Sequence, residues 1–128
     1  MAKPAPPVLS VVIPAHNEAS HLDASLRVVR GTLQALGETF EIIVVDDGSA
    51  DGTWDALQRL AAGEPRIRAI RLSRRFGKEA AICAGLVEAR GRATVVMDSD
   101  LQHPPAMIPE MFRRWRDEGF DLVEAVKV

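Results

Sequence analysis

The sequence predicts an α/β fold in which an open, mostly parallel sheet carries helices on both faces. Apolar segments of strand length alternate with amphipathic segments of helix length along almost the whole chain. The strand segments are continuous apolar runs, which are typical of strands covered on both faces. A length of 128 residues and an apolar fraction of 47% suit one domain of this kind.

Residues 8–13 form the first apolar run, and Pro14 ends it, so this run predicts a buried strand. A helix is expected over residues 20–36, because its leucines and a valine recur at spacings of four and three and form one apolar stripe. Ser20 and Asp23 resemble a capping box at the start of this helix.

The middle of the chain repeats this pattern. The apolar run at 40–45 predicts a second strand, and residues 52–62 predict a helix with its apolar side chains on one face. Residues 66–72 alternate between basic and apolar side chains, which favours a weaker third strand.

The last part of the chain adds two more strands. Residues 77–90 predict a helix rich in small residues, which let a helix lie close to a sheet, and residues 93–97 predict the fourth strand. A further helix is expected from the prolines at 104–105 to the glycine at 119, before a fifth strand at 120–128. The apolar edge of that fifth strand predicts self-association into a homo-oligomer.

Composition excludes several classes of protein. Sixteen basic and eighteen acidic residues give a net charge of −2, which argues against a nucleic-acid-binding protein. The single cysteine cannot form an internal disulfide, and no apolar run approaches the roughly 18 residues that a membrane-spanning helix needs. We therefore expect a cytoplasmic protein with a Pro-rich tail at residues 1–7 and one domain at residues 8–128.

The polar residues that stand out follow the four predicted strands before the last. In parallel α/β sheets, ligands bind beyond the carboxyl ends of the strands, which meet at one edge of the sheet. A cluster of carboxylates is expected at that edge: Glu18, Asp46, Asp47, Asp98 and Asp100. Such a cluster either raises some of the carboxyl pKa values or binds a cation.

The last two of these carboxylates form a candidate metal site with a nearby amide. Asp98, Asp100 and Gln102 alternate along an extended segment, so their side chains are expected on the same side. Their carboxylate and amide oxygens are hard ligands that suit Mg²⁺ or Mn²⁺.

Positive charge is expected at the same edge. Arg74, Arg75 and Lys78 stand at the start of a predicted helix, where free backbone N–H groups would help them to hold a phosphate. Carboxylates, a metal ion and basic groups at one edge of a sheet together predict a site for a metal ion and a nucleotide diphosphate.

Motifs in this order resemble the inverting family 2 glycosyltransferases, which have the Rossmann-like GT-A fold. The motifs are Pro14-x-His-Asn-Glu18, Val44-Val-Asp-Asp-Gly-Ser49 with Asp51 and Thr53, and Asp98-x-Asp100. The longer stretches at 72–80 and 98–104 resemble one branch more closely, the polyprenyl-phosphate glycosyltransferases similar to dolichol-phosphate mannosyltransferase and bactoprenol glucosyltransferase. The resemblance covers residues 8–128 and implies the nucleotide-binding half of a larger enzyme.

The resemblance also implies roles for individual residues that would surround the nucleotide. Pro14, Asn17 and Glu18 would border the nucleotide. Asp46 or Asp47 would hydrogen-bond to its base or ribose.

The remaining implied roles concern the phosphates and the metal. Gly77 and Lys78 would lie near the nucleotide phosphates. Asp98 would face the ribose or the metal, whereas Asp100 and Gln102 would bind the metal, Mg²⁺ or Mn²⁺.

The implied reaction transfers a sugar from a UDP- or GDP-sugar to an acceptor with inversion at the anomeric carbon. In this branch the acceptor is a polyprenyl phosphate, which implies cell-envelope polysaccharide biosynthesis at the inner face of the membrane. No residue outside the nucleotide-binding set is identified as a catalytic base. We therefore expect this chain to bind nucleotide and metal but to turn over poorly by itself.

Two other classes of protein stay open at this point. A receiver-like phosphoacceptor domain also places an acidic pair and a further Asp at the carboxyl edge of an α/β sheet and binds Mg²⁺. A non-catalytic remnant could instead bind a partner subunit through the last predicted strand.

Overall fold

The computed structural model describes residues 5–100 and 105–119. Its strands are β1 (Leu9–Ala15), β2 (Phe40–Asp46), β3 (Ile67–Arg71) and β4 (Ala93–Val96). The helices that alternate with them are α1 (Leu22–Leu36), α2 (Thr53–Gly63), α3 (Lys78–Glu88) and α4 (Met107–Glu118). The fifth strand predicted at 120–128, with the self-association inferred from it, lies outside the described residues.

The four strands form one parallel sheet in the order β3-β2-β1-β4, which confirms the predicted parallel arrangement. This is the order of the first four strands of a Rossmann sheet. A receiver domain would place its third strand next to its first strand. The topology therefore argues against the receiver-like alternative.

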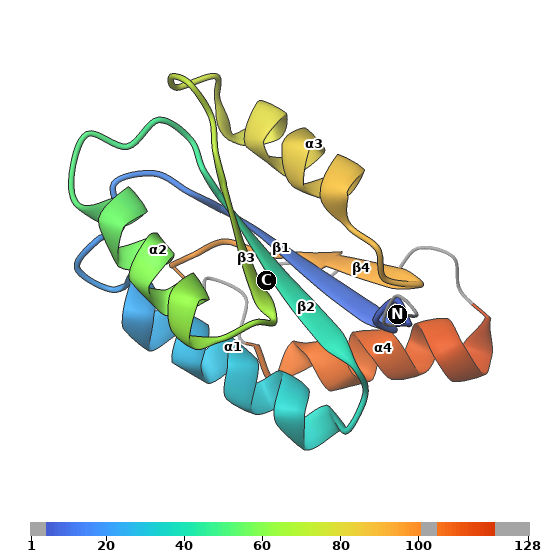
Figure 1. The fold of residues 1–128 in the computed structure, drawn as a ribbon. Helices are drawn as coiled ribbons and strands as arrows, with labels where there is room; N and C mark the ends of the chain where they lie inside the picture. Colours follow the sequence, from blue (N-terminus) through green and yellow to red (C-terminus); the bar gives the residue numbers. More distant parts are fainter. Residues whose placement is uncertain (1–4, 101–104, 120–128) are drawn as a thin grey trace.

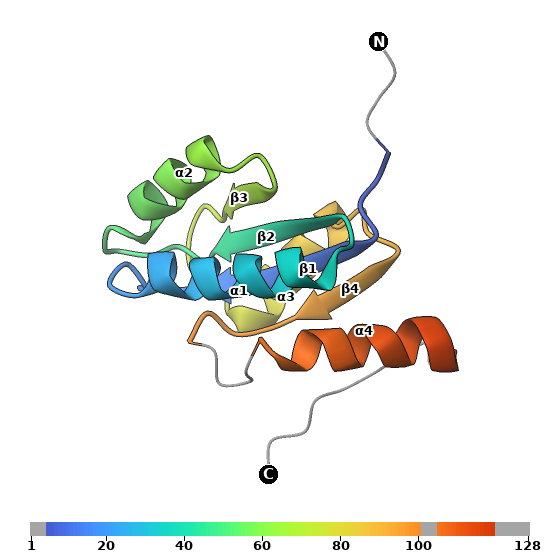
Figure 2. The ribbon, with the colours of Figure 1, turned by 90° about the horizontal axis from the view of Figure 1, so that it is seen from below.

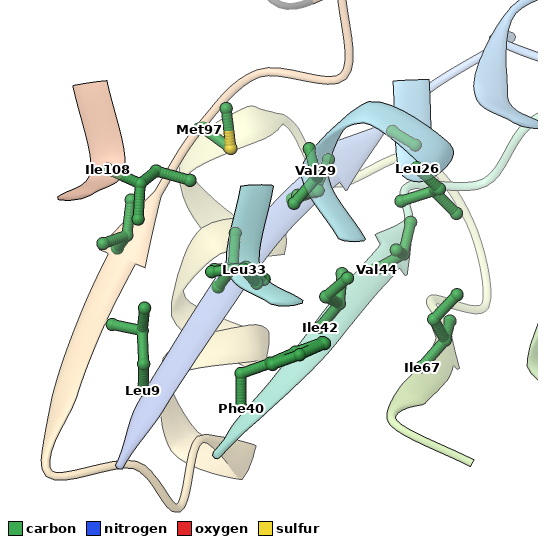
Figure 3. Packing of buried hydrophobic residues seen from close by; sticks show 14 of the residues in the cluster. Leu9, Leu26, Val29, Leu33, Phe40, Ile42, Val44, Ile67, Met97 and Ile108 are labelled. Atoms are coloured by element: carbon green, nitrogen blue, oxygen red, sulfur yellow. The ribbon is translucent and has the colours of Figure 1, made fainter. Parts of the chain in front are cut away.

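Helices cover both faces of the sheet, as predicted (Figures 1 and 2). α1, α2 and α4 lie on one face, whereas α3 lies by itself on the other. Leu26, Val29 and Leu33 of α1 point toward β1 and β2 (Figure 3), and each is at most 2% exposed. Burying a side chain of this kind contributes roughly 1.5–3 kcal/mol, so this apolar stripe fixes α1 across the middle of the sheet.

The opposite face is covered by the small residues of α3. Ala81 and Gly85 are both buried, and they share one side of the helix because they are four residues apart. A Cβ atom on Gly85 would lie 2.4 Å from Val12 Cγ1, so the missing side chain lets the helix approach β1. The prediction that small residues let this helix lie close to the sheet is thus confirmed.

Some predicted helix ends were wrong. α1 begins at Leu22, and the capping box is not formed, because the Ser20 hydroxyl hydrogen-bonds to His21 Nδ1 at 3.1 Å instead. α3 runs only from Lys78 to Glu88 and is shorter than predicted at both ends. In the parts of the chain that the structure describes, no helix has the length and the apolar character needed to cross a bilayer.

Glu64 follows α2 and connects it to α1 and to the start of β3, at the edge of the sheet farthest from β4. It is 9% exposed, and its carboxylate accepts hydrogen bonds from Arg66 Nη2 at 2.7 Å and from Arg30 Nη1 at 3.4 Å. The hydrogen bonds from Arg66 are the main reason that the pKa of Glu64 falls from 4.5 to about 2. A carboxylate with a lowered pKa stabilises the folded chain above its unfolded pKa and loses this effect as the pH falls.

We expect the Glu64 interactions to be fully present above pH 4.5 and to be lost between pH 4.5 and pH 2. Because Arg66 is 40% exposed and therefore partly screened, we expect a loss of about 1–2 kcal/mol. Urea unfolding of the wild type and of Glu64→Gln at pH 6 and pH 3 measures it. The variant should lose less of its free energy of unfolding on acidification, and equal losses in the two proteins would contradict this assignment.

Candidate functional site

The loops that follow the four strands meet at one edge of the sheet. Strand register places Ala15 opposite Asp46 and Val12 opposite Val96, which brings Asp98 alongside the end of β1. These loops surround an open pocket of about 230 Å³, lined by Pro14, Ala15, His16, Glu18, Asp47, Lys78, Asp98, Ser99 and Asp100. Carboxylates from three loops and a cation from the fourth therefore share one pocket.

The loop after β1 is braced by Asn17, which has a left-handed backbone with φ of 53°. Asn17 Oδ1 accepts hydrogen bonds from the N–H groups of Ala50 at 2.9 Å and Asp51 at 3.4 Å, so its Nδ2 is directed to His16 Nε2 at 3.2 Å. His16 Nδ1 lies 2.8 Å from the Asp47 carbonyl oxygen, which can only accept, so Nδ1 carries the proton. The Asn17 side chain is thus used within the protein, whereas His16 lines the pocket.

Glu18 is held at both its backbone and its side chain. Its N–H donates to Thr53 Oγ1 at 2.8 Å, and its carboxylate pairs with His21 Nε2. The Thr53 hydroxyl donates in turn to Asp51, and this hydrogen bond is the main reason that the pKa of Asp51 is lowered. Asp51 and Thr53 therefore position Glu18 at the pocket wall.

The two neighbouring aspartates after β2 make different contacts. Asp46 is completely buried, and its Oδ1 accepts hydrogen bonds from the N–H and hydroxyl groups of Ser49. Its Oδ2 is buried and has no hydrogen-bond partner among the described residues. Asp47 is 3% exposed, and its carboxylate accepts hydrogen bonds from Phe76 N at 2.8 Å and Gly77 N at 3.1 Å. Asp46 thus supports its own loop, whereas Asp47 holds the loop after β3.

The basic loop after β3 contributes one cation to the pocket. Lys78 Nζ lies 2.5 Å from Asp98 Oδ1, and Lys78 lines the pocket. Arg74 places its guanidinium 4.0 Å from the centre of the exposed Phe76 ring, and neither Arg74 nor Arg75 lines the pocket. Of the three cations predicted at this edge of the sheet, Lys78 is the one that lines the pocket.

The backbone N–H groups around the start of α3, which were predicted to help hold a phosphate, are used in part within the protein. The N–H groups of Phe76 and Gly77, directly before the first residue of the helix, donate to the Asp47 carboxylate. A buried carboxylate needs hydrogen-bond donors, and the amino end of a helix supplies them. The predicted phosphate site therefore keeps the Lys78 ammonium, which lines the pocket, and the N–H groups of the first turn of α3, from Lys78 onwards.

The donor set fits a divalent cation that shares its coordination with a ligand. Asp98 and Asp100 both line the pocket, whereas Gln102 lies outside the described residues. Among residues 5–100 and 105–119, no group of three metal-ligating side chains is gathered as a complete protein cage. Mg²⁺ is commonly held by one or two carboxylates together with substrate phosphates, and Asp98 and Asp100 match this arrangement.

Most of the predicted site residues come together. The ones that line the pocket are Pro14, Glu18, Asp47, Lys78, Asp98 and Asp100. Asn17, Asp46 and Gly77 lie next to the pocket without lining it, and their contacts hold the loops. His16 and Ser99 were missed, although each stands between predicted residues in its loop.

Known proteins with similar sequences are glycosyltransferases. The model of the family described as Glycosyl transferase family 2 matches residues 10–126. An uncharacterised glycosyltransferase of Synechocystis sp. is 42% identical over 119 residues, which cover 93% of this chain and 37% of that protein. An undecaprenyl-phosphate 4-deoxy-4-formamido-L-arabinose transferase of Pseudomonas paraeruginosa is 39% identical over 121 residues, which cover 94% of this chain and 35% of that protein. The chain thus spans little more than a third of the length of these relatives.

Solved structures with a similar fold include a glycosyltransferase. The mannosyltransferase PcManGT from Pyrobaculum calidifontis, in complex with GDP-Man and Mn²⁺, matches with a TM-score of 0.75 and 27% identity, over 88% of this chain and 33% of that chain. S. aureus TarS in complex with UDP-GlcNAc matches with a TM-score of 0.58 over 81% of this chain and 32% of that chain, and at 23% identity this shows the fold alone. The observed sheet is accordingly the Rossmann-like sheet of a GT-A fold. With a family model that matches nearly its whole length, the chain belongs to glycosyl transferase family 2.

Proposed function

We propose that this chain binds a nucleotide diphosphate sugar together with a divalent cation and forms the donor-binding domain of a glycosyltransferase, with residues 8–128 as one unit. The observation that carries the proposal is the convergence of Lys78, Asp98 and Asp100 in one pocket at the carboxyl edge of a parallel sheet. Ligands of open α/β sheets bind at this edge.

Two carboxylates would hold the cation, Mg²⁺ or Mn²⁺. Asp98 and Asp100 would be its protein ligands, with Gln102 as a further predicted ligand outside the described residues. The bound cation would neutralise charge on the diphosphate leaving group, which is worth several kcal/mol in the transition state. The complex of PcManGT with GDP-Man and Mn²⁺ supports the presence of a divalent cation beside the donor.

The other pocket residues would bind the donor directly. Lys78 would place its ammonium beside the diphosphate, where a cation stabilises phosphate oxygens. Pro14 and Glu18, from the loop after β1, form the wall along which the nucleoside would lie. Asn17 and Asp46 would act from behind the pocket by holding their loops.

We further propose that the acceptor is a polyprenyl phosphate and that the reaction inverts the anomeric carbon. The names of the undecaprenyl-phosphate transferases among the relatives support this acceptor. A phosphate oxygen is already ionised at neutral pH and can attack without a strong general base, whereas a sugar hydroxyl would need one. A direct displacement of this kind inverts the stereochemistry, and a lipid acceptor places the reaction at the cytoplasmic membrane surface.

Calorimetric titration tests the proposed donor and cation. We expect the purified chain to bind GDP or UDP in the presence of Mn²⁺, and we expect EDTA to weaken this binding about 10-fold or more. The corresponding monophosphate serves as the control, because it lacks the second phosphate that would reach Lys78. Equal binding with Mn²⁺ and with EDTA, or no saturable binding of either diphosphate, would contradict the proposal.

A further inference from the structure

We infer that the exposed part of the loop after β3 is a surface that binds anionic lipid bilayers. This surface, the basic loop patch, consists of Arg71, Arg74, Arg75 and Phe76. The inference rests on the proposed function and deepens it, because it names the part of the chain that would bring the pocket to a lipid-borne acceptor.

Positive charge is concentrated in this part of the chain. Residues 65–78 contain six cations and no carboxylate, although the net charge of the whole chain is −2. Three of these cations, Arg66, Arg68 and Lys78, pair with carboxylates of the protein. The other three are the arginines of the basic loop patch, which are exposed and have no carboxylate partner among the described residues. Their charge is therefore available to an anionic surface.

An exposed aromatic ring lies among these arginines. Phe76 is 48% exposed, and the Arg74 guanidinium lies 4.0 Å from the centre of its ring. At the end of β3, the Arg71 guanidinium lies 5.5 Å from the centre of the Trp54 ring. Surfaces that bind to membranes from the water side combine Arg or Lys, which anionic lipids attract, with Trp, Phe or Leu, which enter the lipid interface. The basic loop patch has both components.

The basic loop patch is held in a fixed position next to the pocket. Phe76 N donates to the Asp47 carboxylate at 2.8 Å, and a Cβ atom on Gly48 would lie 2.4 Å from Arg75 N, so this loop packs directly on the loop after β2. Lys78, two residues after Phe76, lines the pocket. Figure 1 shows the loop between β3 and α3 beyond the end of the sheet. A bilayer that contacts Phe76 would therefore lie beside the pocket.

A membrane fits this surface better than a nucleic acid does. Proteins that bind single-stranded nucleic acids use a positively charged groove that follows the phosphate backbone. Here the unpaired arginines belong to one short loop, and the adjacent pocket carries the carboxylates of Asp98 and Asp100. A bilayer needs only local contact, because its anionic headgroups are spread over a surface.

Vesicle co-sedimentation tests the inference without any nucleotide. The probes are phosphatidylcholine vesicles with and without about 30% phosphatidylglycerol, at about 0.1 M salt. We expect the chain to partition onto the anionic vesicles at least about 10-fold more strongly than onto the neutral ones, because the three arginines are attracted together. Raising the salt to about 0.5 M should remove most of this difference, since salt screens exposed charges.

Substitutions within the basic loop patch should weaken this binding. Arg74→Gln combined with Arg75→Gln should weaken partitioning onto the anionic vesicles about 10-fold or more. Phe76→Ser should weaken it about fivefold, because the ring no longer enters the lipid interface. All three side chains are exposed, so the fold should remain intact, which thermal unfolding checks.

Arg59→Gln combined with Arg92→Gln is the matched control. Both arginines are exposed and have no carboxylate partner among the described residues, so the control removes the same charge. Arg59 lies on α2, whereas Arg92 directly precedes β4 at the amino edge of the sheet. This double variant should change partitioning by less than about twofold, because neither charge lies in the basic loop patch.

Several outcomes would overturn the inference. These are equal partitioning onto neutral and anionic vesicles, no partitioning onto either, and equal losses in the two double variants. Binding of single-stranded RNA that is lost in the Arg74 and Arg75 double variant, without vesicle binding, would assign the surface to a nucleic acid instead.

The calorimetric titration with GDP or UDP separates this inference from the proposed function. A wild type that binds a diphosphate but no vesicles would refute only the lipid surface. A wild type that binds anionic vesicles but no diphosphate would refute the proposed function and leave the lipid surface in place.

Discussion

Asp98→Asn is expected to weaken binding of UDP or GDP in the presence of Mn²⁺ by about 100-fold. The substitution keeps the shape of the side chain but removes the charge that attracts a cation, and it leaves the Lys78 ammonium without its partner 2.5 Å away. Asp98 is only partly buried, with 25% of its side chain exposed, so we expect the fold to remain intact. Calorimetric titration measures the affinity, and thermal unfolding checks the fold.

Asp23→Asn is the control for this experiment. Asp23 is also an aspartate with an ion-pair partner, Arg27, but it lies on the exposed side of α1, outside the pocket. Its removal should change diphosphate affinity by less than about twofold, because an exposed pair of this kind is worth little and makes no contact with the pocket. Similar losses in Asp98→Asn and Asp23→Asn would show that net charge, rather than the pocket, governs binding.

Gly48→Ala is expected to lower the free energy of unfolding by about 3 kcal/mol or more. Two costs add at this position. An alanine is strained at φ of +65°, and its Cβ would lie 2.4 Å from Arg75 N and 2.5 Å from the Arg74 carbonyl carbon. Both atoms belong to the backbone, so relief requires a shift of the whole loop after β3. Urea unfolding monitored by circular dichroism gives the change.

Gly37→Ala separates the two costs. Gly37 also has a positive φ, +82°, but a Cβ there would have no neighbouring atom within 4 Å. This variant should lose only about 1–2 kcal/mol, the cost of a left-handed residue with a side chain. Equal losses of unfolding free energy in Gly37→Ala and Gly48→Ala would mean that the loops after β2 and β3 do not lie in direct contact. We also expect Gly48→Ala, but not Gly37→Ala, to weaken diphosphate binding, because the displaced loop carries Lys78.

The elements of this fold could be predicted because their apolar patterns are local. The run from Val11 to Ile13 is apolar at every position, and the structure buries it on both faces of the sheet. Leu22, Leu26 and Val29 repeat with the helical period, and all three face the core. The helix ends were predicted less well, because at Ser20 a hydrogen bond to the adjacent His21 competes with the cap.

Most residues that line the pocket could be named from the sequence, but the contacts that each of them makes could not. Asp46 and Asp47 are adjacent and chemically identical, yet one is buried behind its own loop and the other holds the amino end of α3. Arg74 and Lys78 carry the same charge, yet Arg74 stacks on Phe76 and only Lys78 lines the pocket. Nothing in the local pattern distinguishes the members of either pair.

The chain's own order of apolar and polar segments determined that a parallel sheet forms and that acidic loops gather at its carboxyl edge. This follows from local physics, because side-chain period and strand direction depend on neighbouring residues. Only the tertiary structure decided which carboxylates line the pocket and which backbone groups donate hydrogen bonds to each of them. That choice depends on backbone N–H groups about thirty residues away in the chain, such as the N–H of Phe76 opposite Asp47, and a buried carboxylate takes whichever donors folding brings to it.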